Sequence, residues 1–371
     1  MTHTATRPPS IQLMTLLSHL LLAPREGDRS SSSKMAGLKS KVRSIGRREF
    51  DDLLRLADSN HVLVRGLETL LGMMREAKDD TRAEWAQTAL TVERARIDNA
   101  LAFLDEICSA FEKEKYDVAV IKSLDHWPDL GSDLDLYTNA TSEVISDLMK
   151  RRFRAQIAPR SWGDRLACKW NFLVPGLPEA VEIHMGRLGQ TGEQAAIALR
   201  LAERTRLVSI GDHVFRVPSA SDRLMISTLQ RMYRHFYFRL CDIVDTAELA
   251  ETGGIDYEDL RSSASRAGIW EGVATYLAIV SDYVRQYRGA GLRLPQFVIA
   301  SARFGGDDVY YNRSFLRVPI VPQSVKLYGS QLAGLLRKRE LNNGVRLSLL
   351  PWLATAAVVG QKITGSDKGI W

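Results

Sequence analysis

The amino-acid sequence predicts an α+β fold in which a mixed β-sheet core over 116–218 is flanked by helical regions on both sides. Helical periodicity precedes this core at 50–74 and 81–113. It returns after the core at 257–267 and 270–288. The 371 residues, 45% of them hydrophobic, are enough to bury a substantial core. Short apolar or alternating runs typical of strands lie within the core, at 118–121, 133–138, 168–174 and 180–185.

Five regions are expected along the chain. Residues 1–45 should form a flexible basic arm with one short helix. The apolar run 11–22 is expected to be that helix and not a signal peptide, because polar residues interrupt it and no signal-peptide cleavage site follows it. A linker rich in Ser, Gly, Lys and Arg lies at 25–41. The other regions are an amino-terminal helical region (46–115), the core (116–218), a carboxy-terminal helical region (219–290) and a basic extension of unknown role (291–371).

Charge is distributed unevenly along the sequence. Residues 1–50 hold nine Lys and Arg against three acids, and residues 285–346 hold eleven against three, so the middle of the chain is acidic. Basic flanks of this kind bind nucleic acid, anionic lipid or an acidic partner, or are simply solvated faces. No nucleic-acid-binding motif supports the first of these alternatives.

The carboxy-terminal apolar run 347–360 lies between basic residues. It is too short to span a bilayer comfortably, and it contains Pro351. Two alternatives remain for it, peripheral contact with a membrane and packing against the body of the protein.

The three cysteines, Cys108, Cys168 and Cys241, are widely spaced and form no zinc or redox pattern. Disulfides are rare in reducing compartments. We therefore expect the cysteines to be reduced core residues of a cytoplasmic protein.

Two carboxylates lie two residues apart in the apolar run 133–138. On a β-strand, Asp133 and Asp135 project from the same face. Two acids on one face repel each other and are costly to bury, so a chain that places them there usually has a cation for them to share. A divalent metal is the natural candidate, although an isolated pair of this kind is also common without one.

Small and cationic residues accompany these acids. Gly131 and Ser132 give a flexible approach to the strand, with a hydroxyl and backbone N–H groups beside the carboxylates. Lys122 and Ser123 end the preceding apolar run. Because turns with free N–H groups cradle phosphate, we expect these four residues to bind a triphosphate.

A third carboxylate completes a site for two metal ions in phosphoryl transfer. Glu182 is the candidate, on an alternating run that forms a predicted β-hairpin with 168–174 across a Pro- and Gly-containing turn. If Glu182 faces the same side as the other acids, His184 does too, since strands have a period of two. The alternative is that Glu182 is a solvent-facing strand residue.

A later segment, Arg231 to Leu249, reads as a helix. His235, Arg239 and Asp242 recur in it at spacings of four and three, which places them on one helical face. Facing the site, His235 and Arg239 would contact the phosphates or the base of a nucleotide. The alternative is an ion pair between Arg239 and Asp242 within the helix.

This order of parts resembles the nucleotidyltransferase superfamily of the DNA polymerase beta type, and within it a bacterial family of uncharacterised nucleotidyltransferases. The superfamily has a Gly-Ser turn, a D-x-D strand and a later third acid, matched here by Asp133, Asp135 and Glu182. The resemblance extends over roughly 45–255 and includes 49–70 and 231–249. Two departures are Ser123, where the family commonly has Gly after Lys, and Glu182, where Asp is more usual.

The resemblance implies a nucleotidyltransferase-type core and a metal-dependent transfer of a nucleoside monophosphate from an NTP, by default ATP, to a hydroxyl acceptor, with release of pyrophosphate. Mg²⁺ or Mn²⁺ would be held by Asp133, Asp135 and Glu182. The acceptor is expected to be a small molecule or a biosynthetic intermediate. The alternatives are protein nucleotidylation and a non-catalytic nucleotide-binding scaffold that kept the fold.

Overall fold

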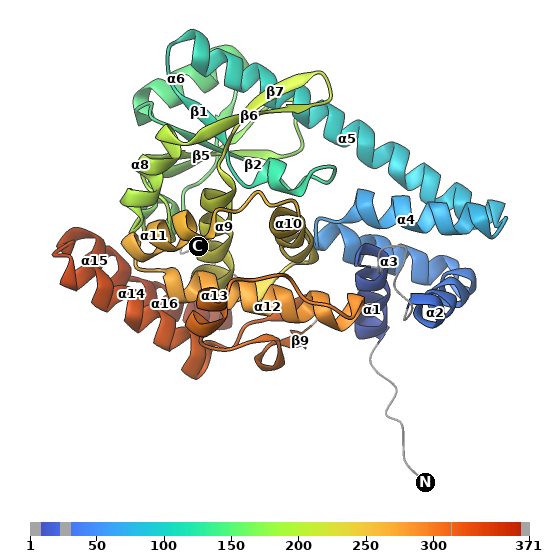
Figure 1. Cartoon of the computed structure of the whole chain (residues 1–371). Helices are drawn as coiled ribbons and strands as arrows, with labels where there is room; N and C mark the ends of the chain where they lie inside the picture. Colours follow the sequence, from blue (N-terminus) through green and yellow to red (C-terminus); the bar gives the residue numbers. More distant parts are fainter. Residues whose placement is uncertain (1–8, 23–30, 313, 365–371) are drawn as a thin grey trace.

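The computed structural model describes residues 9–22, 31–312 and 314–364, and it confirms an α+β fold with a mixed sheet and flanking helices (Figure 1). The four predicted strands of the core and the predicted helices at 81–113, 257–267 and 270–288 are present with small shifts of their ends. The amino-terminal part consists of helices α1 (Pro9–Leu21), α2 (Ser31–Ser44), α3 (Arg47–Ser59), α4 (Leu63–Glu76) and α5 (Asp80–Lys113).

The short helix expected within 1–45 is present as α1. The linker expected at 25–41 is wrong for the part of it that the structure describes, because the chain is helical from residue 31 onward, in α2. Leu16 and Leu17 of α1 are buried against α3 and α4, and the Ser18 hydroxyl lies 2.7 Å from the Tyr283 hydroxyl of α12 (Trp270–Arg288). Burial of this apolar face holds α1 to the body. Residues 1–8 and 23–30 lie outside the described residues.

The single helix predicted over 50–74 is two helices, because the chain turns at Asn60 and His61. The backbone of His61 has φ +52°, a left-handed conformation that ends α3. The N–H of Val64, in the first turn of α4, donates to the Asp129 carboxylate at 2.5 Å. A side chain from the core region therefore fixes the start of α4.

The core sheet has the strand order β1-β2-β5-β4-β3. Strands β2 and β5 are parallel, and all other neighbours are antiparallel. Leu134 and Ile183 point to the face opposite the acids and are fully buried, while α5 packs against β1. The strands are β1 (Val118–Val120), β2 (Asp133–Thr138), β3 (Gln156–Ile157), β4 (Lys169–Leu173) and β5 (Ala180–Met185), with helices α6 (Ser142–Phe153) and α7 (Trp162–Leu166) between them.

A second hairpin follows the core sheet. After α8 (Ala195–Glu203), β6 (Thr205–Ile210) and β7 (His213–Pro218) pair around Gly211, whose φ of +56° suits a tight turn. Ser219 then caps α9 (Ala220–Thr228), its hydroxyl accepting the Asp222 N–H at 3.3 Å. After this hairpin, the chain continues on the side of the sheet that carries the acids.

The carboxy-terminal half is mostly helical. The predicted helices at 257–267 and 270–288 are present. The region from 289 to 328, expected to be irregular, contains a short helix and two short strands, β9 and β10, and β10 pairs with both β9 and β8 (Tyr237–Phe238). The elements are α10 (Leu240–Glu251), α11 (Tyr257–Arg266), α12, α13 (Gln296–Ser301), β9 (Tyr310–Asn312), β10 (Phe315–Arg317), α14 (Val325–Arg337), α15 (Leu341–Ser348) and α16 (Leu350–Thr364).

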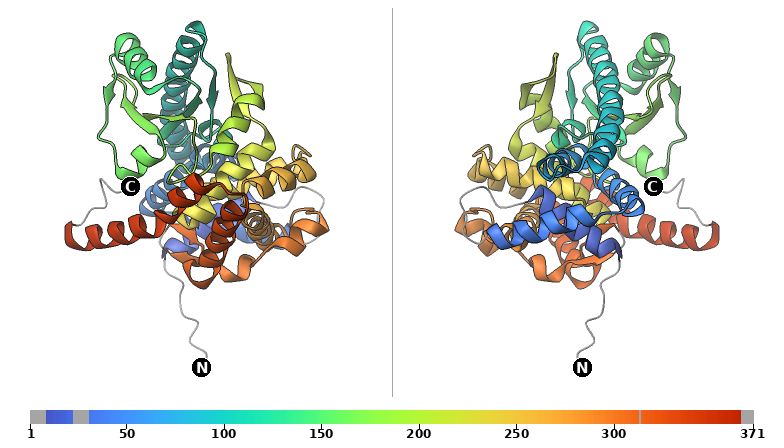
Figure 2. Two further views of the ribbon diagram at one scale, coloured as in Figure 1. Left: turned by 90° about the vertical axis from the view of Figure 1, so that its left-hand side faces the viewer. Right: turned by 90° about the vertical axis from the view of Figure 1, so that its right-hand side faces the viewer.

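Helix α16 carries most of the apolar run 347–360. It extends away from the body of the molecule (Figure 2), and Trp352 is 76% exposed. The expectation that this run packs against the body is therefore wrong for α16, whereas Leu347 in α15 is buried. Among the helices that the structure describes, none is both long enough and apolar enough to cross a membrane.

Candidate active site

The three predicted acids lie on adjacent parallel strands. Asp135 of β2 stands directly beside Glu182 of β5 in the register, and Asp133 lies two residues earlier on the same face. Carboxylate oxygens of Asp135 and Glu182 and a ring nitrogen of His184 all lie within 4.8 Å of one another. We call Asp133, Asp135 and Glu182 the acid cluster. The prediction that they share one face of the sheet is confirmed.

Two lysines and a histidine surround the acid cluster. The Lys122 ammonium bonds to Asp135 and lies 3.4 Å from Glu182 Oε1. The Lys169 ammonium lies 2.6 Å from Glu182 Oε2. His184 Nε2 is 2.8 Å from Glu182 Oε1. Both lysines are largely buried, so their positive charges offset those of the acids at short range.

The pKa values follow from this arrangement. Loss of hydration, and then repulsion from Asp135 and Glu182, raise the pKa of Asp133. Burial alone would raise the pKa of Glu182, but Lys122 and Lys169 hold it well below its ordinary value. Burial likewise opposes the charge of Lys122, whereas Asp135 and Glu182 raise its pKa. Glu182 is therefore ionised, whereas burial and the neighbouring carboxylates make Asp133 easier to protonate than an exposed aspartate.

Lys122 is aimed at the acids by a tight turn. Its φ of +63° and ψ of −58° form a γ-turn, in which the Ser123 N–H donates to the Ile121 carbonyl at 2.7 Å. A non-glycine residue in this conformation is strained. Strained backbone clusters at functional sites, and here it directs a buried ammonium between two carboxylates.

The predicted phosphate-binding residues divide into two groups. The Ser123 hydroxyl accepts the Asp135 N–H at 2.7 Å and donates to the Asp133 carbonyl at 3.1 Å, so it fixes β2 and is not a free donor. Gly131 and Ser132 line the same pocket as the acids. A Cβ on Gly131 would meet the His61 ring at 3.0 Å, so this position needs glycine for close packing.

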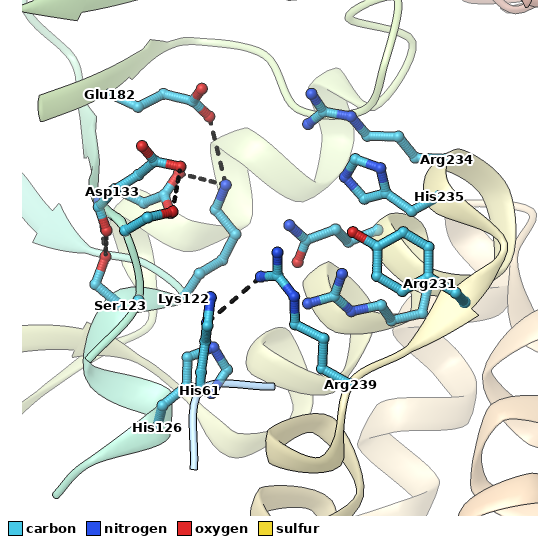
Figure 3. Close-up of a pocket in the computed structure, with 15 residues that line it drawn as sticks. His61, Lys122, Ser123, His126, Asp133, Glu182, Arg231, Arg234, His235 and Arg239 are labelled. Carbon is cyan, nitrogen blue, oxygen red and sulfur yellow. Dashed lines mark hydrogen bonds and ion pairs between the residues drawn. The ribbon is translucent and has the colours of Figure 1, made fainter. Parts of the chain in front are cut away.

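A wall rich in cations faces the acid cluster across the pocket (Figure 3). Arg234 and His235 point into the cavity opposite Glu182, and Arg239 reaches toward it from below. The pocket lining on this side, which we call the cationic wall, consists of Gln230, Arg231, Arg234, His235, Tyr237 and Arg239.

The predicted single helix over 231–249 is wrong. The chain forms a π-helical turn over Leu229–His235 that ends where Phe236 adopts φ +54°, and α10 begins only after the Arg239 cap. His235 and Arg239 nevertheless both line the pocket. The predicted Arg239 to Asp242 ion pair is replaced by two contacts of Asp242, from the Arg239 N–H at 2.7 Å and from Arg231 Nε at 2.7 Å.

The cations of this wall differ in how they are engaged. Arg231 is buried and neutralised by Asp242. Arg239 makes a long 3.4 Å contact with His61 Nδ1, and its buried Nε has no hydrogen-bond partner among the described residues. Within the described parts of the chain, Arg234 has neither a hydrogen bond nor an ion pair. Burial, and then the neighbouring arginines, lower the pKa of His235 well below its ordinary value.

His184 lies where the strand period places it, beside Glu182, but it lines a smaller adjoining pocket and not the main one. The sequence interpretation missed Lys169, Gln230, Arg231 and Arg234. Lys169 could have been found from the predicted hairpin, since it pairs with His184 in register and so shares the face of Glu182. No sequence signal indicates Arg234, because the π-helical turn that orients it has no simple pattern.

The acid cluster fits a hard divalent cation. Its donors are carboxylate oxygens, which Mg²⁺ and Mn²⁺ prefer. Asp135 and Glu182 are close enough to share an ion, in the position where the Lys122 ammonium now bonds to both. Burial, and then repulsion from Asp135 and Glu182, raise the pKa of Asp133, and a bound cation would relieve that repulsion.

Comparison with known proteins adds nothing to this geometry. No protein-family model matches the chain, and no curated protein is similar to it. The function must therefore be argued from the pocket, in which carboxylates on a sheet face a wall of arginines.

Proposed function

We propose that the protein is a metal-dependent nucleotidyltransferase, which transfers a nucleoside monophosphate from an NTP to a hydroxyl group and releases pyrophosphate. One observation carries the proposal. Asp135 and Glu182 stand side by side on parallel strands and face Arg234 and Arg239 across one pocket. Such a pocket can hold a metal ion on one side and a triphosphate between the two walls.

The fold supports the family resemblance. The acids lie at the start of β2 and in the middle of its parallel neighbour β5, in a mixed sheet with a helical region on each side. The resemblance to the DNA polymerase beta-type superfamily rests on this same D-x-D and third-acid pattern. Three unpaired cysteines agree with the proposed cytoplasmic location.

Asp133, Asp135 and Glu182 would hold Mg²⁺ or Mn²⁺, and a bound ion would lower the pKa of the acceptor hydroxyl and neutralise phosphate charge. Arg234 and Arg239 supply unneutralised guanidinium groups for the phosphate oxygens. The acceptor oxygen attacks the α-phosphorus. A P–O bond forms there, the bond from the α-phosphorus to the bridging oxygen of the β-phosphate breaks, the acceptor proton leaves to solvent, and pyrophosphate departs.

The acceptor is proposed to be a small molecule, with ATP as the default donor. The main pocket is joined by a smaller one that shares Lys122, Gln230 and Arg234 with it, and Ile226 and Leu229 make the smaller pocket partly apolar. This small recess beside the main pocket suits a compact acceptor molecule better than a hydroxyl group on the surface of another protein. Protein nucleotidylation and a non-catalytic scaffold are the alternatives that the experiment separates.

The experiment follows the α-phosphate. The full chain is incubated with α-³²P-labelled NTP, Mg²⁺ and an extract of the source organism, and label is measured separately in the small-molecule and protein fractions. Wild type is compared with Asp135→Asn and with the exposed control Asp147→Asn. We expect label in the small-molecule fraction that Asp135→Asn abolishes and the control keeps. Label only in protein would establish protein nucleotidylation instead, and no label that depends on Asp135 would refute the enzymatic proposal.

A further inference from the structure

A second group of ligand-type side chains borders the same pocket. His61, His126 and Cys241 place one ring nitrogen each and the Sγ atom within 4.8 Å of one another. The Cys241 Sγ lies 3.9 Å from His126 Nε2. His61 and His126 line the main pocket, and Cys241 is buried behind them. We call these three residues the His/Cys cluster. It is distinct from the acid cluster and has no role in the proposed transfer.

The orientation of His126 is fixed from behind. Its Nδ1 lies 2.5 Å from Asp245 Oδ2, and because an ionised carboxylate only accepts, Nδ1 carries the hydrogen. Asp245 is held in turn by Arg65, whose Nη1 is 2.7 Å away, and Arg65 also bonds to Asp129 at 2.8 Å. A carboxylate behind a histidine is the usual support of a metal-binding imidazole. It directs Nε2 of His126 toward the Cys241 thiol.

Asn60 joins the segments that carry His61 and Cys241 by hydrogen bonds. Its carbonyl accepts the Cys241 N–H at 3.2 Å, and its side-chain oxygen accepts the Leu240 N–H at 3.0 Å. Asn60 itself is completely buried. His61 follows in a left-handed conformation, φ +52°, that turns its ring into the pocket. Two positions 180 residues apart are thereby held in a fixed relation.

We propose that the His/Cys cluster binds one Zn²⁺ ion, with a fourth coordination position open to the pocket. Imidazole nitrogen and thiolate sulfur are the donors that zinc prefers over Mg²⁺. In a tetrahedral zinc site the donor atoms lie roughly 3.3 to 3.6 Å apart, so the 3.9 Å between Cys241 and His126 needs only a small adjustment. Three protein ligands and one open position are typical of catalytic zinc, in contrast to closed structural sites.

One contact competes with this site. Arg239 Nη1 lies 3.4 Å from His61 Nδ1, and zinc at His61 requires this contact to open or the ring to turn. A hydrogen bond of that length is weak, and Arg239 can remain in the pocket without it. The fourth position would then take water, or an oxygen or sulfur atom of a molecule bound beside the cationic wall.

The test measures metal in the untagged full chain. The protein is produced with added zinc, passed through gel filtration, and analysed for metal by mass spectrometry. We expect about one zinc per chain, a loss of most of it in Cys241→Ser, and full retention in the matched control Cys168→Ser, whose thiol lies outside the cluster. Asp135→Asn should also retain zinc, so the result does not depend on the nucleotidyltransferase proposal.

A spectrum of the cobalt-substituted wild type keeps the proposal testable if Cys241→Ser does not fold. A thiolate ligand gives Co²⁺ an intense near-ultraviolet charge-transfer band, and His61→Gln, a change at the pocket surface, should weaken Co²⁺ binding and reduce the band. Circular dichroism checks that the variants are folded. Absence of both bound zinc and the thiolate band in wild type would overturn the proposal and leave a metal-free hydrogen-bonded cluster, as would zinc content unchanged in a folded Cys241→Ser.

Discussion

The acid cluster and the His/Cys cluster border one pocket, but the chain builds them in different ways. The acids come from β2 and β5, where strand register alone places Asp135 beside Glu182. The members of the His/Cys cluster come from a turn between helices, a short 3₁₀ turn and the start of α10. Local periodicity therefore specifies the first cluster, whereas only the tertiary packing assembles the second.

The two clusters also differ in how their charge is balanced. Lysines inserted among the carboxylates, Lys122 and Lys169, offset the charge of Asp135 and Glu182 in the acid cluster. The His/Cys cluster is instead supported from behind by a carboxylate and an arginine, Asp245 and Arg65. A pocket with oxygen donors at one side and nitrogen and sulfur donors at another can sort hard from soft metal ions.

The largest expected effect is on catalysis by the acid cluster. Asp135→Asn removes one carboxylate charge at the centre of the cluster and should lower the rate of label transfer on the order of 10²- to 10³-fold or more, as loss of a preorganised electrostatic group does. The amide has the same shape and Lys122 keeps Glu182 as a partner, so the variant should remain folded, which its melting temperature checks. Rates are measured against Asp147→Asn on exposed α6. Undiminished transfer by Asp135→Asn would remove Asp135 from the site.

The next effect concerns the buried ion pair that Arg231 of the cationic wall forms with Asp242. Arg231 and Asp242 are both nearly inaccessible to solvent and lie 2.7 Å apart. Asp242→Ala leaves the guanidinium buried and unpaired, so we expect a loss of about 3–5 kcal/mol in the free energy of unfolding. Urea denaturation measures it. The control Asp52→Ala, which breaks an exposed pair with Arg55, should cost less than about 1 kcal/mol. Similar losses for both variants would contradict the buried pairing.

A smaller effect tests whether Lys122 and a metal ion share one position. Lys122→Met leaves Asp135 and Glu182 without the ammonium between them, so the protein in EDTA should lose about 1–3 kcal/mol of stability. Mg²⁺ should then raise the melting temperature more in this variant than in wild type, because binding no longer has to displace the lysine. An equal Mg²⁺ shift in both proteins would mean that the ion binds elsewhere.

The smallest expected effect is on a group of ion pairs far from both clusters, which serves as a control for the other predictions. Arg204 donates hydrogen bonds to Asp259, and Arg200 forms a second ion pair with it. Together they hold the pKa of Asp259 below its ordinary value, although partial burial acts in the opposite direction. The stability from these pairs is therefore present above the unfolded pKa of about 4 and is lost as pH falls below it. We expect Asp259→Asn to cost about 1 kcal/mol at pH 7, and less at pH 3, in thermal unfolding. A loss of stability that is as large at pH 3 as at pH 7 would contradict the pairing.

The strand period predicted the most from sequence. It placed Asp133, Asp135, Glu182 and His184 on one face, and the structure has all four there. The same rule would have added Lys169, had the register of the predicted hairpin been followed through to its end. Sheet geometry repeats every two residues, so a short stretch of sequence contains enough information to fix which side chains meet.

The helical period failed where the helix is interrupted. His235 and Arg239 reach the pocket, but on either side of a backbone reversal at Phe236 and not on one helical face. For a related reason, the sequence does not predict the His/Cys cluster. It predicts only that Cys241 is a core residue. The proximity of Cys241 to His61 depends on buried Asn60, which bonds to a residue 180 positions away. Contacts of that separation leave no periodic trace in the sequence.

The most direct measurement is thermal unfolding of the full chain with each of ATP, GTP, CTP and UTP, in Mg²⁺ and in EDTA, for wild type and Asp135→Asn. A ligand that binds only the folded state raises the melting temperature. We predict that at least one nucleotide raises it in Mg²⁺, that EDTA abolishes the shift, and that Asp135→Asn abolishes it too. No shift with any nucleotide, or a shift that is the same in EDTA and in Asp135→Asn, would contradict a metal–nucleotide site at the acid cluster.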